Sequence, residues 1–125
     1  MRRLLVISLA VGFFASTSTA RAEEPLVKKV RTALDGGIAY LKTTQKPQVA
    51  GKWNWENDTL NLLQPGGSSC LAMLALVTAG VPADDPVIKR GLPYIRSLKP
   101  QHTYVVGLQT MLFAEIGDRQ DLFQI

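Results

Sequence analysis

GGIAYLKTTQKPQVAGKWNW, residues 36–55, is the stretch that decides the fold. Its first half continues a helical pattern over residues 26–45, in which apolar side chains recur every three or four positions and form one stripe. This stripe consists of Val27, Val30, Leu34, Ile38 and Leu41. Gly36 and Gly37 weaken such a helix by about 1 kcal/mol each, so we expect a neighbouring segment to pack closely against them. The second half is a polar loop that contains both tryptophans of the chain.

The first 22 residues have the features of a secretory signal peptide. Arg2 and Arg3 precede an apolar run over residues 4–15, and small polar residues lead to an Ala20-Arg21-Ala22 cleavage pattern. The alternative is a membrane anchor or a buried helix, but the run is short for a membrane span, and nothing else in the chain approaches one. We therefore expect an exported protein, periplasmic or extracellular, with residues 23–125 as its mature part and no transmembrane segment after cleavage.

The charge balance gives no reason to expect a nucleic-acid partner. The whole chain has a formal charge of +4, but three basic residues lie in the expected signal peptide. The remaining 11 Lys and Arg and 10 Asp and Glu leave the mature part near neutral, whereas nucleic-acid binding needs a basic surface. The single cysteine, Cys70, cannot form an internal disulfide and lies in an apolar run, so we interpret it as a core residue.

An apolar helix is predicted after the loop, over residues 68–79. Ser68 or Ser69 can cap its start, and Gly80 suits its end. Because this helix is apolar on every side, we expect it to be buried on every side.

Two further helices are predicted in the second half of the chain. Asp85-Pro86 opens the first of them with an N-cap and a proline in the first turn, and Pro93 should kink or break it. Thr103 can cap the next helix, over residues 104–116, which ends at Gly117. Residues 118–125 have the pattern of the start of one more helix. No segment alternates as a strand would, so the sequence predicts an all-α protein.

The helices repeat as pairs. GIAYL at residues 37–41 corresponds to GLPYI at residues 91–95, 54 positions later, and residues 71–80 correspond to residues 108–117, 37 positions later. Internal repeats of this kind predict stacked helical hairpins, in which each pair buries a face against the next. The predicted units are repeat one at about 27–80, repeat two at about 86–117 and the start of a third at 118–125.

The repeat resembles a known family. Residues GGIAYLKTTQ, five further residues and the Gly-Lys-Trp that follows are similar to the repeat motif of squalene-hopene-type terpene cyclases, within the prenyltransferase and squalene-oxidase repeat superfamily. The matching positions are Gly37, Tyr40, Leu41, Gln45, Gly51 and Trp53. The second copy keeps Tyr94 and Ile95 but has Lys99 in place of the glutamine and lacks the glycine-tryptophan pair. The resemblance covers roughly residues 27–117 and implies part of an α/α-toroid.

The resemblance also implies a structural role for the loop, in which the glutamine and tryptophan join the first helix of a pair to the helix that follows. A glutamine at a helix end can bond orphan backbone groups of a neighbouring terminus. A tryptophan over those bonds would shield them, and Gly51 would allow close approach. The alternative is that Trp53 and Trp55 form an exposed ligand platform, for instance for sugar rings. Trp55 lies outside the motif, so both roles stay open for it.

No set of residues in the sequence predicts catalysis. Squalene-type cyclases use a protonated aspartic acid in an Asp-x-Asp-Asp motif, but Asp84-Asp85 lacks this spacing, and Asp85 is better explained as a helix cap. Protein prenyltransferases of this fold hold zinc with aspartate, cysteine and histidine. Here His102 and Cys70 are single residues without paired ligand spacing. We therefore predict no catalytic residue, no metal site and no cofactor.

Three functions remain open at this point. The first is a non-catalytic binding or scaffold module with an unknown ligand. The second is the N-terminal part of a longer cyclase-like or prenyltransferase-like enzyme that acts on an isoprenoid. The third is a polysaccharide-active toroid. If residue 125 is the end of the protein, two repeats are too few for a ring, and self-association becomes an additional expectation.

Overall fold

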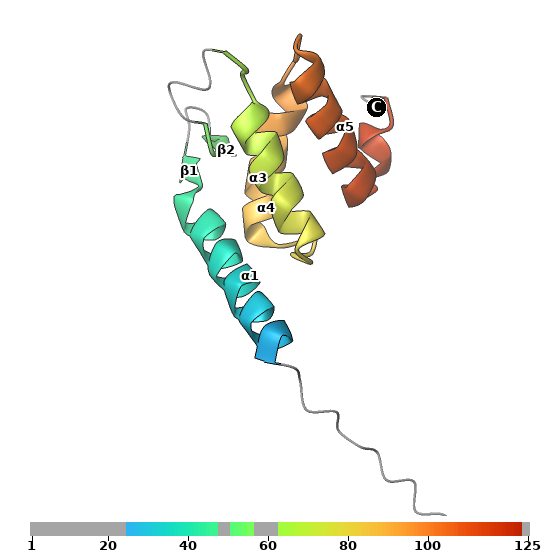
Figure 1. The fold of residues 1–125 in the computed structure, drawn as a ribbon. Helices are drawn as coiled ribbons and strands as arrows, with labels where there is room; N and C mark the ends of the chain where they lie inside the picture. Colours follow the sequence, from blue (N-terminus) through green and yellow to red (C-terminus); the bar gives the residue numbers. More distant parts are fainter. Residues whose placement is uncertain (1–24, 48–50, 57–62, 124–125) are drawn as a thin grey trace, which may run out of the picture.

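Helices make up most of the part of the chain that the structure describes. The computed structural model describes residues 25–47, 51–56 and 63–123 (Figure 1). In chain order its elements are α1 (Pro25–Thr44), β1 (Lys46–Pro47), β2 (Trp53–Asn54), α3 (Gly67–Thr78), α4 (Pro86–Ser97), α5 (Thr103–Ile116) and the 3₁₀ turn η2 (Arg119–Asp121). The predicted all-α class is confirmed in its helical content. The signal peptide expected over residues 1–22 lies outside the described residues.

A small two-stranded sheet lies in the tryptophan loop, residues 46–66, directly after the end of α1. β1 and β2 pair antiparallel, with Lys46 opposite Asn54 and Pro47 opposite Trp53. Our expectation of a chain without strands is therefore wrong here. Each strand has only two residues, which is too short for the alternation that reveals a strand in a sequence.

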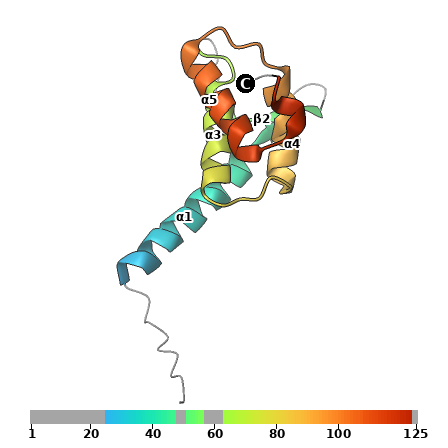
Figure 2. The ribbon, with the colours of Figure 1, turned by 90° about the vertical axis from the view of Figure 1, so that its right-hand side faces the viewer.

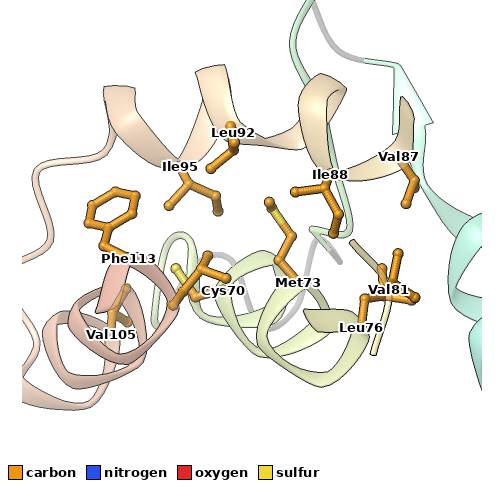
Figure 3. Packing of buried hydrophobic residues seen from close by; sticks show 11 residues of the cluster. Cys70, Met73, Leu76, Val81, Val87, Ile88, Leu92, Ile95, Val105 and Phe113 are labelled. Carbon is orange, nitrogen blue, oxygen red and sulfur yellow. The ribbon is translucent and has the colours of Figure 1, made fainter. Parts of the chain in front are cut away.

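The helices α3, α4 and α5 pack together around the core of the molecule. α3 and α5 lie side by side and run in the same direction, while α4 runs in the opposite direction beside them (Figures 1 and 2). The buried apolar side chains gather between these three helices (Figure 3). They are Cys70, Met73, Leu76, Val81, Val87, Ile88, Leu92, Ile95, Val105, Leu112 and Phe113.

α1 differs from the other helices because none of its 20 residues is buried. Ile38 and Leu41 pack partly against the core, whereas the N-terminal half of the helix extends beyond the other elements (Figures 1 and 2). The apolar stripe is therefore largely exposed, and Leu34 keeps 50% of its surface in solvent. A Cβ at Gly36 or Gly37 would have nothing within 4 Å. Our expectation of close contact at these glycines is therefore wrong within the described residues, because no described segment packs closely against them.

Two helix ends agree with the predicted caps. Asp85 Oδ1 accepts a hydrogen bond of 2.9 Å from the Val87 N–H at the start of α4. At the end of α3, Gly80 has a φ of 91°, a left-handed conformation that glycine adopts without a Cβ penalty. This turn lets the Val81 N–H reach the Leu76 carbonyl at 3.0 Å, so that the last carbonyls of the helix are partly satisfied.

α4 continues through Pro93 to Ser97, so the expected early break does not occur. Pro93 lies on the exposed side of the helix. The carbonyl that loses its usual donor belongs to Lys89, which is also exposed and therefore accessible to water. The core-facing side chains of α4 keep their helical spacing on both sides of the proline.

The predicted start of α5 and the predicted burial of α3 need correction. His102, not Thr103, takes the N-cap position of α5, and its side chain makes no capping hydrogen bond. α3 is apolar all round, but Leu71 keeps 50% of its surface exposed. The reason is that α5, α4 and α1 cover only part of the circumference of α3.

The segment after α5 forms only one 3₁₀ turn in the described residues, and an ion-pair cluster fixes it to α4. Arg96 Nε donates to Asp121 Oδ1 at 2.7 Å, and its Nη2 donates to Asp121 Oδ2 at 2.8 Å and to Asp118 Oδ2 at 2.9 Å. Asp121 has no exposed surface. A bidentate arginine–carboxylate pair therefore holds η2 in place beside α4.

Arg96→Met is expected to lower the free energy of unfolding by about 3 kcal/mol, because it leaves a buried carboxylate without its partner. Arg96→Lys keeps the charge but loses the bidentate geometry and should lose less. Urea denaturation followed by circular dichroism measures both. Equal midpoints for Arg96→Met and the unaltered chain would contradict the assigned role of the pair.

The ion pair between Lys42 and Asp85 should make stability depend on acidic pH. Lys42 Nζ lies 2.6 Å from Asp85 Oδ2, and this hydrogen bond, followed by that from the Val87 N–H, lowers the pKa of Asp85 below its ordinary value of 3.8. A carboxyl whose pKa is lower in the folded state stabilises the fold above its unfolded pKa, and this contribution is lost as the pH falls through the folded value.

Asp85→Asn keeps an N-cap acceptor but removes the charge. It should therefore lower the free energy of unfolding by up to about 1 kcal/mol at neutral pH, since Lys42 is partly exposed. The difference from the unaltered chain should vanish well below pH 3.8. Urea denaturation over a pH series measures this, with Lys42→Gln as the partner variant. A difference that stays constant down to the lowest pH would refute the assignment.

Candidate functional site

The end of α1 is joined to the start of α4 by Gln45. Its side chain is 6% exposed, and its Nε2 donates a hydrogen bond of 2.9 Å to the Val87 carbonyl in the first turn of α4. The resemblance implied a bond to the helix that follows α1, which is α3. The observed acceptor of the Gln45 hydrogen bond lies one helix further on, in the first turn of α4. Asp85, which accepts a hydrogen bond from Lys42, lies at the same end of α4.

Trp55 joins the same end of α1 to α3. Its indole Nε1–H donates to the Leu41 carbonyl at 2.8 Å, and its backbone N–H donates to Ser69 Oγ at 3.0 Å. We had expected this linking role of Trp53, the tryptophan of the motif. Trp53 instead lies in β2, half-buried, with the Arg90 guanidinium 4.5 Å from its ring centroid, which is a cation–π distance.

The side chains of Gln45 and Trp55 meet at Gly91. A Cβ at this position would lie 2.8 Å from Met73 Sδ, 3.3 Å from Gln45 Nε2 and 3.4 Å from Trp55 Cζ3. Gly91 therefore leaves room for three side chains, which are Met73 of α3, Gln45 directly after α1 and Trp55 of the tryptophan loop. We call this contact the glutamine–tryptophan junction.

Glu56 has a structural role at the start of α3 that the sequence did not reveal. It is 7% exposed, and its Oε1 accepts hydrogen bonds from the Ser69 N–H at 3.2 Å and from Ser69 Oγ at 2.6 Å. A carboxylate at this place accepts a hydrogen bond from an N–H of the first turn of α3 that has no partner within the helix. The positive end of the helix dipole also stabilises its negative charge. Ser69 is thus not itself the cap, and Gly66, with a φ of 88°, takes the N-cap position. Because Glu56 precedes Ser69 by 13 residues, no local capping pattern could have identified it.

Burial raises the pKa values of two side chains that also feel the charge of Glu56, Cys70 and Tyr94. Burial, assisted by the charge of Glu56, raises the pKa of the Cys70 thiol to about 12. The same two causes raise the pKa of the Tyr94 hydroxyl to about 12. The thiolate is the reactive form of cysteine, so Cys70 is chemically inert near neutral pH and serves as a core residue.

A long groove runs along α1 where it faces α3, and we call it the α1–α3 groove. The section next to the junction has a volume of about 460 Å³. Its walls include Tyr40, Trp55, Glu56 and Leu71. The section further towards the N-terminus of α1 has a volume of about 390 Å³. Its walls include Val30, Leu34, Gly37 and Leu76. Leu41 and Ala75 line both sections, so the two form one continuous and mostly apolar surface.

The structure brings together only part of the predicted motif. Leu41 and Gln45 belong to the junction, while Tyr40 stays 67% exposed on the wall of the groove. Gly51 has a φ of 72°, but a Cβ there would meet no atom of the described residues within 4 Å, so Gly51 makes no close approach to any of them. Trp53 contacts α4 through Arg90 rather than the junction.

The residues considered for catalysis or metal binding lie apart. Asp85 caps α4, Cys70 is buried in the core, and His102 is exposed before α5. Within residues 25–47, 51–56 and 63–123, no three His, Cys, Asp or Glu side chains gather as a metal site would require.

The comparisons with protein-family models, curated proteins and solved structures gave no match for this chain. Among the helices that the structure describes, none is both long and apolar enough to cross a membrane.

Gly91 and Gly37 hold equivalent positions in the two repeats, but their surroundings predict opposite responses to alanine. Gly91→Ala should lower the free energy of unfolding by about 1–3 kcal/mol, because its Cβ would overlap Met73. Gly37→Ala should raise it by about 0.5–1 kcal/mol at low protein concentration, because the site is open and alanine favours the helix. Urea midpoints of the two variants test this. Equal shifts would mean that the junction does not contact Gly91 in solution.

Proposed function

We propose that this chain is an exported, non-catalytic binding module built from stacked helical hairpins of the α/α-toroid type, and that it binds an apolar helix in the α1–α3 groove. The observation that carries the proposal is the apolar stripe of α1, which is exposed over most of a 20-residue helix with no buried residue. An apolar helix face in solvent marks an interaction surface. Helix-in-groove binding uses anchors at this spacing.

The correspondence between the two repeats supports the hairpin arrangement. α3 and α5, which the sequence repeat relates, lie side by side and run parallel (Figure 1). Both end at a glycine with positive φ, Gly80 at 91° and Gly117 at 69°. α4 lies against α3 as the outer helix of the second hairpin, as α1 does for the first. This is the order of elements that the resemblance to squalene-cyclase-like repeats implies.

The described contacts favour binding by the groove over a sugar platform made of tryptophans. The indole N–H of Trp55 already donates to the Leu41 carbonyl, and the ring of Trp53 lies against Arg90. Both aromatic side chains are thus engaged within the chain. Asp85 and His102, the candidates for an enzymatic role, lie at the starts of α4 and α5, two neighbouring helices that run in opposite directions (Figure 1).

The test is binding of Nile red, a neutral apolar dye, at low protein concentration. Leu34→Gln and Val30→Gln remove apolar wall from the groove and should clearly reduce the dye emission relative to the unaltered chain. Thr32→Gln, on the opposite side of α1, is the matched control and should leave the emission unchanged. Near-ultraviolet circular dichroism verifies that each variant keeps its tertiary structure. Emission that is the same for all four proteins would reject the groove as a binding surface.

A further inference from the structure

The two outer helices, α1 and α4, carry the same apolar pattern but are covered very differently. Leu34 is 50% exposed, while Ile88, its equivalent 54 positions later, has no exposed surface. Likewise Ile38 is half-buried, while its equivalent Leu92 is buried. The apolar stripe of α1 thus has the same pattern as the stripe of α4, which other helices of the chain cover.

The helix that covers α4 is α3. Met73 reaches over Gly91, with its Sδ 2.8 Å from the position that a Cβ would take. In α1 the equivalent glycine, Gly37, has nothing within 4 Å of its Cβ position. By internal correspondence, the segment that fits over Gly37 is a helix with the chemistry of α3, antiparallel to α1.

α5 has this chemistry, and one of its faces is open. It is apolar nearly all round, as α3 is. Cys70 and Met73 of α3 belong to the core and Val77 packs against it, but their equivalents 37 residues later lie on an open face of α5. That face consists of Gly107, Thr110 and Ala114, with the exposed Val106 beside it, and a Cβ at Gly107 would meet no described atom within 4 Å. Each chain therefore carries one groove and, on its far side, one helix that matches it.

We propose that α5 of a second copy of this chain docks in the α1–α3 groove, in the relation to α1 that α3 has to α4. This inference rests on the proposed binding function of the groove and names its partner. The contact joins two different surfaces, so it is heterologous, and copies stack head to tail instead of forming a symmetric dimer.

The charges at the ends of the two helices agree with this orientation. α3 and α5 run parallel, and α1 runs opposite to them (Figure 1), so the C-terminus of the docked α5 would lie towards the N-terminal half of α1. Lys28 and Lys29 flank the stripe there. Glu115 and the negative end of the α5 dipole would then lie near these lysines, which is favourable.

The experiment is sedimentation velocity of the purified exported chain over a wide concentration range. The unaltered chain should grow from monomer through dimer to longer species as the concentration rises. Leu34→Glu disables the groove and Val106→Glu disables the α5 face, and each alone should weaken association by at least about tenfold, since each places an unpaired charge in an apolar contact. Both side chains are substantially exposed in the monomer, so both variants should keep their melting temperature.

A mixture of the two variants decides the geometry. Leu34→Glu keeps a working α5 face and Val106→Glu keeps a working groove, so the mixture should form a one-to-one dimer that cannot grow further. Gln101→Glu, on another surface, is the charge-matched control and should assemble like the unaltered chain. Glu115→Lys should weaken assembly, and the effect should shrink at high salt.

Several results would overturn the inference. The first is a chain that stays monomeric at every concentration, and the second is assembly that neither glutamate variant affects. The third is a mixture that forms no dimer. If dye binding still depends on Leu34 in any of these cases, the groove remains a binding surface whose partner is a different apolar helix. If dye binding is also insensitive, the proposed function fails together with the inference.

Discussion

The hydrogen bond from the Trp55 indole to the Leu41 carbonyl is the contact on which the position of α1 depends. Because α1 buries no residue, burial of apolar surface gives it little hold on the rest of the molecule. Polar bonds at its last turn do this instead, namely those of Trp55, of Gln45 with Val87 and of Lys42 with Asp85. The sheltered surroundings of the first two strengthen them. α1 is thus anchored at one end, and the face that forms the groove is left open along its length.

The sequence predicted what depends on local pattern. The periodicity of apolar residues placed the four α-helices closely, and Asp85 and Gly80 were identified as a cap and a stop because their chemistry acts within two or three residues. The glutamine–tryptophan junction was predicted only in outline. Trp53 was chosen over Trp55 from the motif, whereas the indole that reaches Leu41 is set by the pairing of β1 with β2, which no pattern in the sequence reveals.

Contacts between distant positions explain the remaining errors. Glu56 caps α3 from 13 residues away, and Gln45 bonds a carbonyl 42 residues later. Neither pair has a spacing that a helix or a turn would impose. Gly37 and Gly91 show the same limit more clearly, since each begins a pentapeptide of the same apolar pattern, GIAYL and GLPYI. Only Gly91 has side chains against it, because a repeat pattern defines which face of a helix is apolar and leaves open what covers that face.

The open glycines provide a physical reason to regard the two exposed faces as one interface. Gly37 in α1 and Gly107 in α5 both lie inside helices, where each costs about 1 kcal/mol relative to alanine. Neither has a neighbour within 4 Å of its Cβ position, and neither has a positive φ that would require glycine. Among residues 25–47, 51–56 and 63–123, no contact at these two positions offsets this cost. A glycine on the face of a helix leaves room for the side chains of a neighbouring helix, as Gly91 does for Met73 of α3. Contact between copies through these faces would use both glycines in the same way, and it would cover the apolar stripe that a single copy leaves in water.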